Sequence, residues 1–342
     1  MARLKDIAKE TGLSISTVSR ILSNDPNRSF SDEAIAKVQE AAGRLGYFEK
    51  YRMRSKALTT MRLSIACILT SDHETYLSPF FAALLEGVQE EVFRQSSRNA
   101  LTFHTLYVKD PSFPAFLETT NLDGAIILGR TTIDTIQRLK RSIPILLYAG
   151  VNRLGNGVDE VICDAESATK EAVEHLLALG HRAIGFIGHI PQKDETINEH
   201  RFNGYLGALR KAGIEYDDSL VVNTILTATG GYQATKTLIS RGKIPTAIFC
   251  SNDTVAMGVL KALDEAGIHV PNDLSLIGFD NIEATAFTKP ALTTIDIPKR
   301  DLGRLAVKTL LDRIESKRTF PISVRLPFTL IRRESCKEVA DE

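Results

Sequence analysis

Small hydroxyl side chains and one arginine lie close to the N-terminus, on what the apolar spacing predicts to be the outer face of a helix. The residues on that face are Ile15, Ser16, Ser19, Arg20 and Ser23. None of them is acidic, so the face would not repel a phosphate backbone, and its small side chains allow a close approach to base edges. This pattern predicts a helix that reads DNA.

A second group of polar and aromatic residues follows predicted strands or opens predicted helices further along the chain. Its members are Phe80, Phe81, Tyr148, Arg201, Asn252, Asp253, Phe279 and Asp280. A guanidinium that forks onto neighbouring hydroxyls, carboxylates that accept from them and aromatic walls for the apolar ring face would form a sugar site. Simpler explanations exist for several members. Asn252 and Asp253 would serve equally as a helix N-cap, Arg201 as a surface ion-pair partner of Glu199, and the phenylalanines as core.

The elements that position the first group form a predicted three-helix unit. A short helix contains Leu4, Ile7 and Ala8, Gly12 supplies a sharp turn over Leu13, and Ser14 is placed to cap the second helix. A third helix is expected from about residue 32 to 45, with Ser31 as its cap. The inward positions are Val18, Ile21 and Leu22 in the second helix and Ile35, Val38, Ala41, Ala42 and Leu45 in the third, and Tyr47 closes the unit. This is helix-turn-helix spacing, which places the second helix in a major groove.

Composition restricts the class of protein. The 342 residues are 43% hydrophobic and 25% charged, which is ordinary for a globular chain. Residues 1–62 carry 12 Lys and Arg against 7 Asp and Glu, whereas the remainder carries 30 against 35, so a basic head precedes a mildly acidic body. No membrane span or signal peptide is apparent, and we expect a cytoplasmic protein. The four cysteines lack metal-ligand spacing, so we expect free thiols, no metal and no cofactor.

After residue 62, short apolar runs alternate with helical stretches. The runs are 63–69, 101–107, 124–128, 143–148, 161–163, 183–188, 247–250 and 274–279, and the helical stretches lie near 80–97, 132–141, 165–180, 197–213, 230–241 and 253–267. Such alternation predicts parallel strands covered by helices on both faces, in two successive βαβ series. The fold class is therefore α/β, with a helical head and two doubly wound lobes.

The N-terminal stretch LKDIAKETGLSISTVSRIL, residues 4–22, resembles the headpiece of the lactose/galactose repressor (LacI/GalR) family of bacterial transcription regulators. Further matching stretches are HLLALGHR (175–182), IGFIG (184–188), RFNGY (201–205), PTAIFCSND (245–253), IGFD (277–280), LTTI (292–295) and LPFTLIRRES (326–335). The resemblance implies a headpiece at 1–47, a hinge at 48–61, a two-lobed effector domain of the type I periplasmic-binding-protein fold at 62–335, and a tail at 336–342. It places lobe 1 at about 62–160 and 291–320, and lobe 2 at about 161–290 and 321–335.

The resemblance also implies site residues. Operator DNA would be contacted by Arg3, Leu4, Ser14, Thr17, Tyr47, Met53 and Arg54 in addition to the outer face of the second helix. The hinge departs from the family pattern, because Lys56 stands where a leucine enters the minor groove, so Met53 or Leu58 would have to serve. The family's effector contacts align with Arg201, Asn252 and Asp280. The Asp that many sugar-responsive members carry at the end of the fourth strand is replaced here by Tyr148-Ala149-Gly150.

Among family members the chain looks closest to regulators of galactose or β-galactosidase operons, through Asn24-Asp25-Pro26 and the stretch FTKPALTT at 287–294. The expected protein is therefore a homodimeric repressor that binds double-stranded operator DNA and is released by a galactose-like sugar. The segment after Arg333 is too short for a tetramerisation helix. A purine-like co-repressor, or a sugar-binding protein without gene control, are the alternatives. Enzyme activity is not expected, because the common catalytic motifs are missing.

Overall fold

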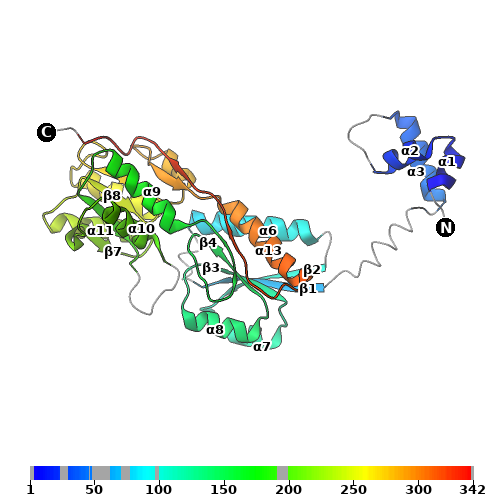
Figure 1. Cartoon of the computed structure of the whole chain (residues 1–342), viewed down its shortest axis with the longest axis horizontal. Helices are drawn as coiled ribbons and strands as arrows, with labels where there is room; N and C mark the ends of the chain where they lie inside the picture. The colour runs from blue at the N-terminus through cyan, green and yellow to red at the C-terminus, as the bar shows by residue number, and fades with distance from the viewer. Residues whose placement is uncertain are drawn as a thin grey trace. The chain divides into compact units, whose positions relative to one another are not determined.

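The computed structural model describes residues 4–23, 30–45, 47, 62–70, 78–96, 100–190 and 199–339. They fall into two compact units that divide near Arg62, and each unit is described by itself (Figure 1). No helix in these ranges has the length and apolar composition needed to cross a membrane.

The first unit is a three-helix headpiece made of α1 (Leu4–Thr11), α2 (Ile15–Ser23) and α3 (Asp32–Arg44). Gly12 has a φ of 72°, which gives the left-handed turn that ends α1. Ser14 caps α2, because its Oγ accepts from the Thr17 N–H at 3.1 Å. The predicted turn and cap are both confirmed.

One small core holds the three helices of the headpiece together. Its buried members are Ile7, Ala8, Val18, Ile21, Val38, Ala41, Ala42 and Tyr47, and Leu4, Leu13, Leu22, Ile35 and Leu45 pack against them. These are the positions that helical spacing predicts to face inward. Ser31 caps α3 by accepting from the Ala34 N–H at 3.3 Å, also as expected. The exposed ion pair of Glu10 with Arg44 joins α1 to α3.

Lobe 1 of the second unit is a six-stranded sheet in the order β11-β5-β4-β3-β1-β2. The strands are β1 (Arg62–Leu69), β2 (Ala100–Tyr107), β3 (Gly124–Leu128), β4 (Leu146–Gly150), β5 (Asp159–Ile162) and β11 (Ser323–Arg325). Alternate residues of β1 face opposite sides: Ile65 and Cys67 pack under α6 (Pro79–Ser96) and α13 (Lys299–Ser316), whereas Ala66 and Ile68 pack with α7 (Phe113–Thr119) and α8 (Ile133–Ser142). The expected doubly wound arrangement is confirmed (Figure 1).

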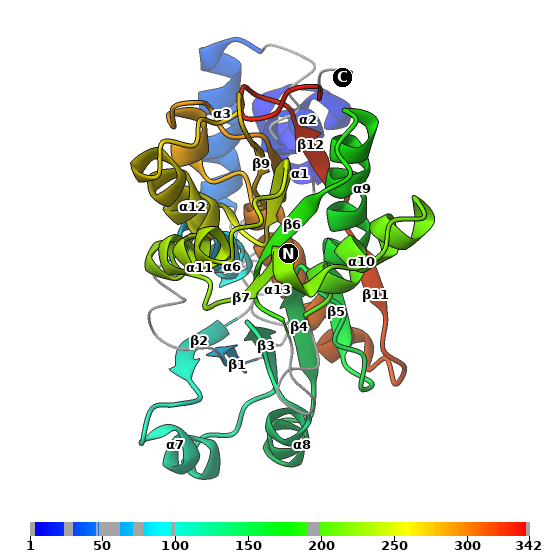
Figure 2. The same cartoon turned by 90° about the vertical axis from the view of Figure 1, so that its left-hand side faces the viewer.

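Lobe 2 repeats this plan with a four-stranded parallel sheet in the order β7-β6-β8-β9. Its strands are β6 (Ile184–Gly188), β7 (Val221–Asn223), β8 (Ala247–Cys250) and β9 (Ser275–Ile277). Figure 2 shows α9 (Ala165–Ala178) and α10 (Arg201–Lys211) on one face, and α11 (Ala228–Ser240) and α12 (Asp253–Glu265) on the other. Short 3-10 turns, η1 (Asp218–Leu220) and η2 (Glu283–Ala286), complete the lobe.

The chain crosses between the lobes three times: after β5, after β10 (Thr294–Asp296) and before β12 (Thr329–Ile331). Strands β10 and β12 pair with each other in antiparallel orientation. Bridges from Ile277 to Thr293 and from Asp280 to Asp296 join β10 to the edge of the lobe 2 sheet. The return to lobe 1 therefore follows Asp296, a few residues later than the expected position near Pro290. Because β11 pairs with β5, the last crossing follows Arg325 and not Pro321.

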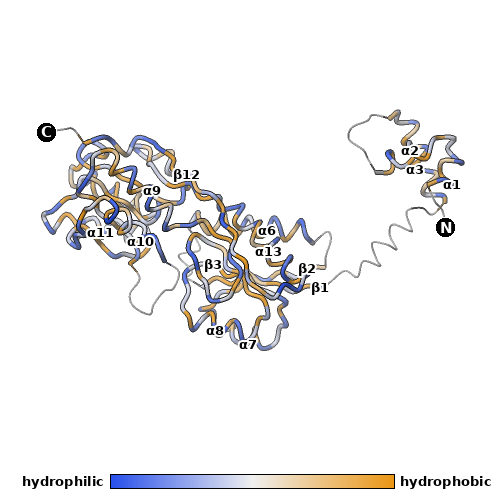
Figure 3. Tube along the Cα trace, viewed as in Figure 1, coloured by the Kyte–Doolittle hydropathy of each residue, from blue (hydrophilic) through white to orange (hydrophobic). Residues whose placement is uncertain are grey.

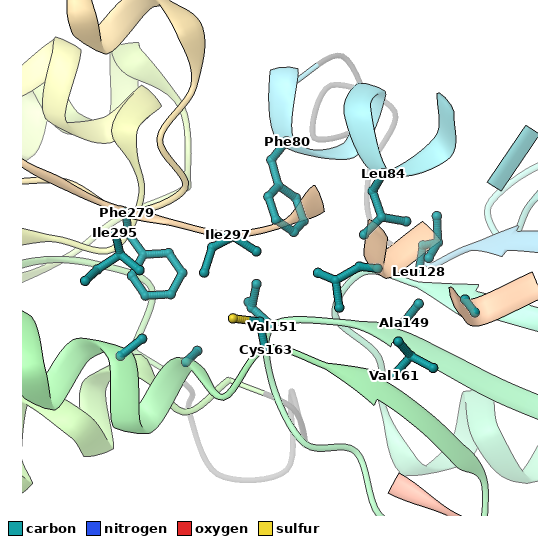
Figure 4. Packing of buried hydrophobic residues seen from close by; sticks show 14 of the residues in the cluster. Phe80, Leu84, Leu128, Ala149, Val151, Val161, Cys163, Phe279, Ile295 and Ile297 are labelled. Carbon is teal, nitrogen blue, oxygen red and sulfur yellow. The ribbon is translucent and has the colours of Figure 1, made fainter. Parts of the chain in front are cut away.

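Apolar packing is continuous from one lobe to the other at these crossings. Phe80 at the start of α6 lies beside Ile297, with Ile295 and Phe279 beyond it and Val151 opposite (Figure 4). The hydropathy-coloured trace shows hydrophobic segments along the inner strands of lobe 1 and polar ones on the outer surface (Figure 3). The crossings thus belong to the core and are not loose linkers.

Candidate functional site

The DNA-reading face predicted for α2 is exposed. Ser14, Ile15, Ser16 and Arg20 are exposed, with Ile15 51% accessible, while Val18 on the opposite face is completely buried. Ser19 and Thr17 are half-buried. The helix therefore presents small polar side chains and one guanidinium outward, as a major-groove helix must.

The other expected DNA contacts differ in how the structure places them. Ser14 Oγ bonds to Ser16 Oγ and Thr17 Oγ1, each at 2.8 Å, so its hydroxyl is engaged in starting the helix. Leu4 packs on the headpiece core, and Tyr47 is 9% exposed within it, so their bulk stabilises the fold. Arg3, Met53, Arg54 and Leu58 lie outside the described residues, as does the side chain of Ser23.

A pocket that is partly open to solvent lies between the two lobes of the second unit. Lobe 1 and its crossing segment contribute Ser78, Phe80, Phe81, Gly129, Arg130, Tyr148, Gly150, Val151 and Asn152, and lobe 2 contributes Arg201, Leu226, Asn252 and Asp280. Most of these residues end a parallel strand or directly follow one, which is where doubly wound sheets bind ligands. Six of the eight predicted effector residues line the pocket; Asp253 and Phe279 do not.

Arg201 at the start of α10 supplies the main polar group of the lobe 2 wall. Its Nε donates to Glu199 Oε1 at 2.8 Å, its Nη2 donates to Glu199 Oε2, and its Nη1 donates to the Ser251 carbonyl. A guanidinium has five N–H groups, so two remain for a ligand. The alternative of a surface pair is wrong, because the Arg201 and Glu199 side chains are 6% and 0% exposed.

The buried pair is held in its ionised form. Burial alone would raise the pKa of Glu199, but the charge and hydrogen bonds of Arg201, together with the charge of Arg130, lower it below the usual value. Burial opposes the charge of Arg201 as well, and Glu199 more than offsets this, so the pKa of Arg201 is raised. Glu199 thus orients the guanidinium and keeps it charged in the pocket.

Asn252 and Asp253 take different roles although they are neighbours. Asn252 is the N-cap of α12: its Oδ1 accepts from the Val255 N–H at 2.8 Å, and its amide nitrogen remains for the pocket. Asp253 is completely buried behind the wall and accepts from Thr294 Oγ1 at 2.6 Å. The prediction that Asp253 contacts the effector is therefore not supported, because its carboxylate faces the strands and not the cavity.

Asp280 lines the pocket in an unusual backbone conformation. Its φ is 113° and that of Asn281 is 50°, so two consecutive non-glycine residues adopt the left-handed region. Lys299 Nζ donates to the carbonyls of both residues, and Asn281 Nδ2 donates to Asp296 Oδ1 at 2.9 Å. Burial and the nearby Asp253 raise the pKa of Asp280 well above its usual value.

Phe279 is fully buried in the core beneath Arg201, whose guanidinium lies 5.5 Å from the centre of the ring. It therefore supports the arginine from behind and does not touch the cavity, which corrects its predicted role as an effector contact.

Aromatic residues form much of the lobe 1 wall. Phe80 and Phe81 pack edge to face with their ring centres 5.1 Å apart. The Tyr148 ring lies over Gly150, where an added Cβ would be 2.3 Å from the phenol oxygen. A glycine is therefore required at 150 for the tyrosine to occupy this place.

Sequence reasoning missed Ser78, Arg130, Asn152 and Leu226. Arg130 follows β3 as directly as Asn252 follows β8, so the strand-end rule applied evenly would have found it. Asn152 is fixed by the structure in a way that the sequence does not indicate: its Oδ1 accepts from the backbone N–H of His200 at 3.0 Å, across the junction of the lobes.

The described residues contain no group of His, Cys, Asp or Glu side chains arranged to hold a metal ion. All four cysteines are described and have free thiols. A two-lobed α/β domain with a pocket at its strand ends, preceded by a helix-turn-helix headpiece, is the architecture expected of a ligand-responsive DNA-binding regulator.

The comparisons with known proteins agree. The family described as "Bacterial regulatory proteins, lacI family" matches residues 3–49, and the "Periplasmic binding protein-like domain" matches residues 173–336. The transcriptional repressor MelR of Bacillus subtilis is 30% identical over 100% of this chain and 99% of its own. The repressor PurR of Pectobacterium carotovorum is 33% identical over 98% of this chain and 97% of its own. The chain belongs to the LacI family of bacterial transcription regulators.

Solved structures give the same result. The complex of the transcriptional regulator CelR with cellobiose has a TM-score of 0.71 at 25% identity, covering 98% of this chain and all of the other. A LacI-family regulator from Enterococcus faecium with bound ribose has a TM-score of 0.67 at 30% identity, covering 81% of this chain and all of the other. The protein is a DNA-binding transcriptional repressor with a small-molecule effector domain.

Proposed function

We propose that the protein represses a sugar-utilisation operon of the galactose or β-galactoside type, in the cytoplasm, and that a small sugar in the inter-lobe pocket releases it from its operator. The observation that supports this proposal most directly is that a polar surface of lobe 2 and an aromatic surface of lobe 1 line the same pocket. Lobe 2 offers the guanidinium of Arg201, the amide of Asn252 and the carboxyl of Asp280, and lobe 1 offers Phe80 and Phe81. Polar groups for hydroxyls opposite aromatic rings for an apolar ring face are what a pyranose requires.

On the DNA side, Ile15, Ser16, Ser19 and Arg20 would face base edges in the major groove. Backbone phosphates would be held by Arg3 and by Ser14, which lies at the N-terminus of α2. A homodimer would place two such helices in successive major grooves, about one DNA turn apart, on a near-palindromic operator.

Two exposed aromatic residues are candidates for a dimer contact. Phe93 on α6 is 82% exposed and Phe287 beside η2 is 77% exposed. We expect these two residues to be covered in the homodimer.

The effector would act by drawing the lobes together, because the pocket takes residues from both and the three crossings join them. Closure would change how two copies present their headpieces to the operator. A coupling free energy of about 1–3 kcal/mol is enough to change operator affinity roughly 5–150-fold.

A non-sugar co-repressor is the alternative, and the PurR-named relatives at 32–33% identity give it a specific basis. The two ligand classes predict opposite effects on DNA. An inducing sugar would weaken operator binding, whereas a co-repressor would strengthen it.

The test measures binding of the full-length protein to its own upstream DNA by fluorescence anisotropy at fixed salt, since the phosphate contribution varies steeply with salt. Galactose, lactose, allolactose and purine bases are titrated separately. Release by a sugar supports the proposal, and tighter binding with a purine base contradicts it. In Asp280→Ala the effect of the active sugar should fall at least about tenfold. The exposed control Asp264→Asn on α12 should respond like the wild type.

A further inference from the structure

One lysine outside the pocket connects its two walls. Lys299 is the first residue of α13, a helix of lobe 1, and its Nζ donates to three backbone carbonyls. The acceptors are the carbonyls of Asp280, of Asn281 at 3.3 Å and of Ile297 at 3.1 Å. An ammonium group has three N–H donors, so these contacts use all of them. The lysine therefore serves the backbone and has no donor left for a ligand.

The turn that Lys299 holds carries the carboxyl group of the lobe 2 wall. Asp280 lines the pocket, and the left-handed conformation of Asp280 and Asn281 costs free energy that the surrounding structure must offset. Within the described residues, the other hydrogen bonds to these two residues come from β10 and from Arg333. Lys299 is thus the hydrogen-bond partner that ties this turn to a helix of lobe 1.

The third carbonyl extends the connection to the aromatic wall of lobe 1. Ile297 is buried, and its side chain lies beside Phe80, which lines the pocket together with Phe81 (Figure 4). Both phenylalanines lie in the first turn of α6, and α6 is joined to α13 by the ion pair of Glu90 with Arg304 at 2.6 Å. The same ammonium group therefore holds the polar turn of lobe 2 and the segment that packs on the aromatic wall.

These contacts act on a ligand only through the positions of other residues. Lys299 does not line the effector pocket; it lines a separate groove with Asn281 and Asp296. A ligand that bonds to Asp280 and packs on Phe81 needs the two walls at one spacing, and a displacement of about 1 Å in such a site is costly. The group that fixes this spacing should therefore determine affinity without touching the ligand.

We propose that Lys299 is a positioning residue for the effector, and that it sets the spacing between the Asp280 carboxyl group of lobe 2 and the aromatic wall of lobe 1. This inference rests on the sugar-responsive function proposed above. Without the ammonium group the three carbonyls lose their shared donor, so the turn is free to move relative to α6. A sugar placed against the phenylalanines would then lose its contact with Asp280.

The first experiment tests the turn itself and needs no ligand. Hydrogen–deuterium exchange with mass spectrometry compares the full-length wild type with Lys299→Met, whose side chain is of similar length but has no donor. The amides of Asp280 and Ile282 are hydrogen-bonded, and peptides that contain them should exchange at least about tenfold faster in the variant. Lys308→Met, at an exposed lysine on the same helix, is the matched control and should exchange as the wild type does. Equal exchange in Lys299→Met overturns the inference.

The second experiment asks whether the held turn matters for the sugar. Isothermal titration calorimetry measures galactose, lactose and allolactose on full-length Lys299→Met, Asp280→Ala and the double variant. Each single change should weaken the releasing sugar at least about tenfold, whereas Asp280→Ala should cost less than about threefold when Lys299→Met is already present, because the carboxyl group is then out of place. The same cycle with Lys308→Met should be additive. Operator affinity without sugar should stay at the wild-type value in all of these variants.

Thermal melting reports whether each variant folds. If Lys299→Met does not fold, Lys299→Gln replaces it in both experiments, since its amide can still donate to one of the carbonyls. The same faster exchange and the same non-additive loss with Asp280→Ala are expected there.

The outcomes separate this inference from the proposed function. If a sugar releases the operator but the losses from Lys299→Met and Asp280→Ala are additive, the repressor function stands and the positioning role of Lys299 is overturned. If none of the sugars binds the wild type while a purine base does, the proposed sugar response fails. The cycle is then measured with that base, and non-additive losses support the positioning role whereas additive losses overturn it.

Discussion

Asp253 connects three segments that are far apart in the sequence. Its carboxylate accepts from Thr294 Oγ1 at 2.6 Å and from the Ile282 N–H at 2.9 Å, and its own N–H donates to the Phe279 carbonyl at 2.8 Å. The residue therefore fixes the turn that carries Asp280, and its effect on ligand binding is through position alone.

This carboxyl should make stability depend on pH. Burial raises the pKa of Asp253 from 3.8 to about 7, so folding favours the protonated form. Its contribution to stability is complete below about pH 4 and is lost as the pH rises toward 7. Urea unfolding should give the wild type a lower free energy of unfolding at pH 8 than at pH 5. This difference should be smaller in Asp253→Asn, because Asn cannot ionise and the Thr294 hydroxyl can rotate to accept a hydrogen bond from its amide. An equal loss in the variant would show that other groups cause it.

Gly150 offers a second test at the scale of one residue. In Gly150→Ala the new methyl group would displace the Tyr148 phenol, which lies 2.3 Å from the Cβ position. We expect affinity for the releasing sugar to fall about tenfold, with operator affinity in the absence of sugar unchanged. Titration calorimetry and DNA anisotropy measure the two quantities. Wild-type sugar affinity in this variant would exclude Tyr148 from the recognition surface.

Much of the pocket follows from strand ends, but its detailed composition does not. Arg201, Asn252 and Asp280 are predicted correctly as pocket residues because parallel strands deliver their carboxyl ends to one edge. Asp253 and Phe279 do not line the pocket, because the Asp253 carboxylate accepts from Ile282 and Thr294 and the Phe279 ring is buried beneath Arg201. Both arrangements depend on tertiary packing. The burial of the Glu199–Arg201 pair depends on tertiary packing, which sequence spacing does not contain.

At the scale of elements, α6 and α13 pack side by side with glycines at their contact. A Cβ on Gly87 would lie 2.1 Å from the Arg300 carbonyl oxygen, and one on Gly303 would lie 2.2 Å from the Leu84 carbonyl oxygen. Because the clashes are with backbone, side-chain rotation cannot relieve them. Ion pairs of Glu86 with Arg300 and of Glu90 with Arg304 run along the same contact.

Gly303→Ala should therefore force the two helices apart and lower the free energy of unfolding by about 1–3 kcal/mol. Gly207→Ala on α10 is the matched control, because nothing lies within 4 Å of its Cβ position. That variant should be neutral or stabilise by about 0.4–1 kcal/mol through the unfolded chain. Urea denaturation of both proteins makes the comparison, and equal free energies would refute close packing at Gly303.

The longer strands of both lobes are predicted well, since a buried parallel strand is a continuous apolar run. The fourth strand is displaced, from the expected 143–148 to Leu146–Gly150, because Ile143 and Pro144 precede the ladder. Five strands have three residues, too few to show a period; of these, β9 is predicted because it lies in the apolar run 274–279, whereas β7, β10, β11 and β12 are not. The helices α7 and α13 were also not predicted, and α13 lies in the stretch that returns to lobe 1.

At the scale of the whole molecule, the headpiece and the two-lobed domain each have their own core. We therefore expect differential scanning calorimetry to show two transitions. The releasing sugar at about 100 times its Kd should stabilise the two-lobed domain by about 2.7 kcal/mol and leave the headpiece transition in place, whereas operator DNA should move the headpiece transition. A single transition that moves as a whole with the sugar would show that the two units unfold together.

The order of the strands in lobe 1 has a consequence for the synthesis of the protein. Because α13 covers one face of the sheet and β11 forms its edge, lobe 1 is completed only when residues 299–325 have left the ribosome, long after its first five strands. The described hydrophobic core of the headpiece lies within residues 4–47 and includes none of that later sequence. The nascent chain thus acquires first the helix proposed to read DNA, and last the complete lobe that forms one wall of the pocket. A translation product released before Lys299 would carry the headpiece without a pocket to control it.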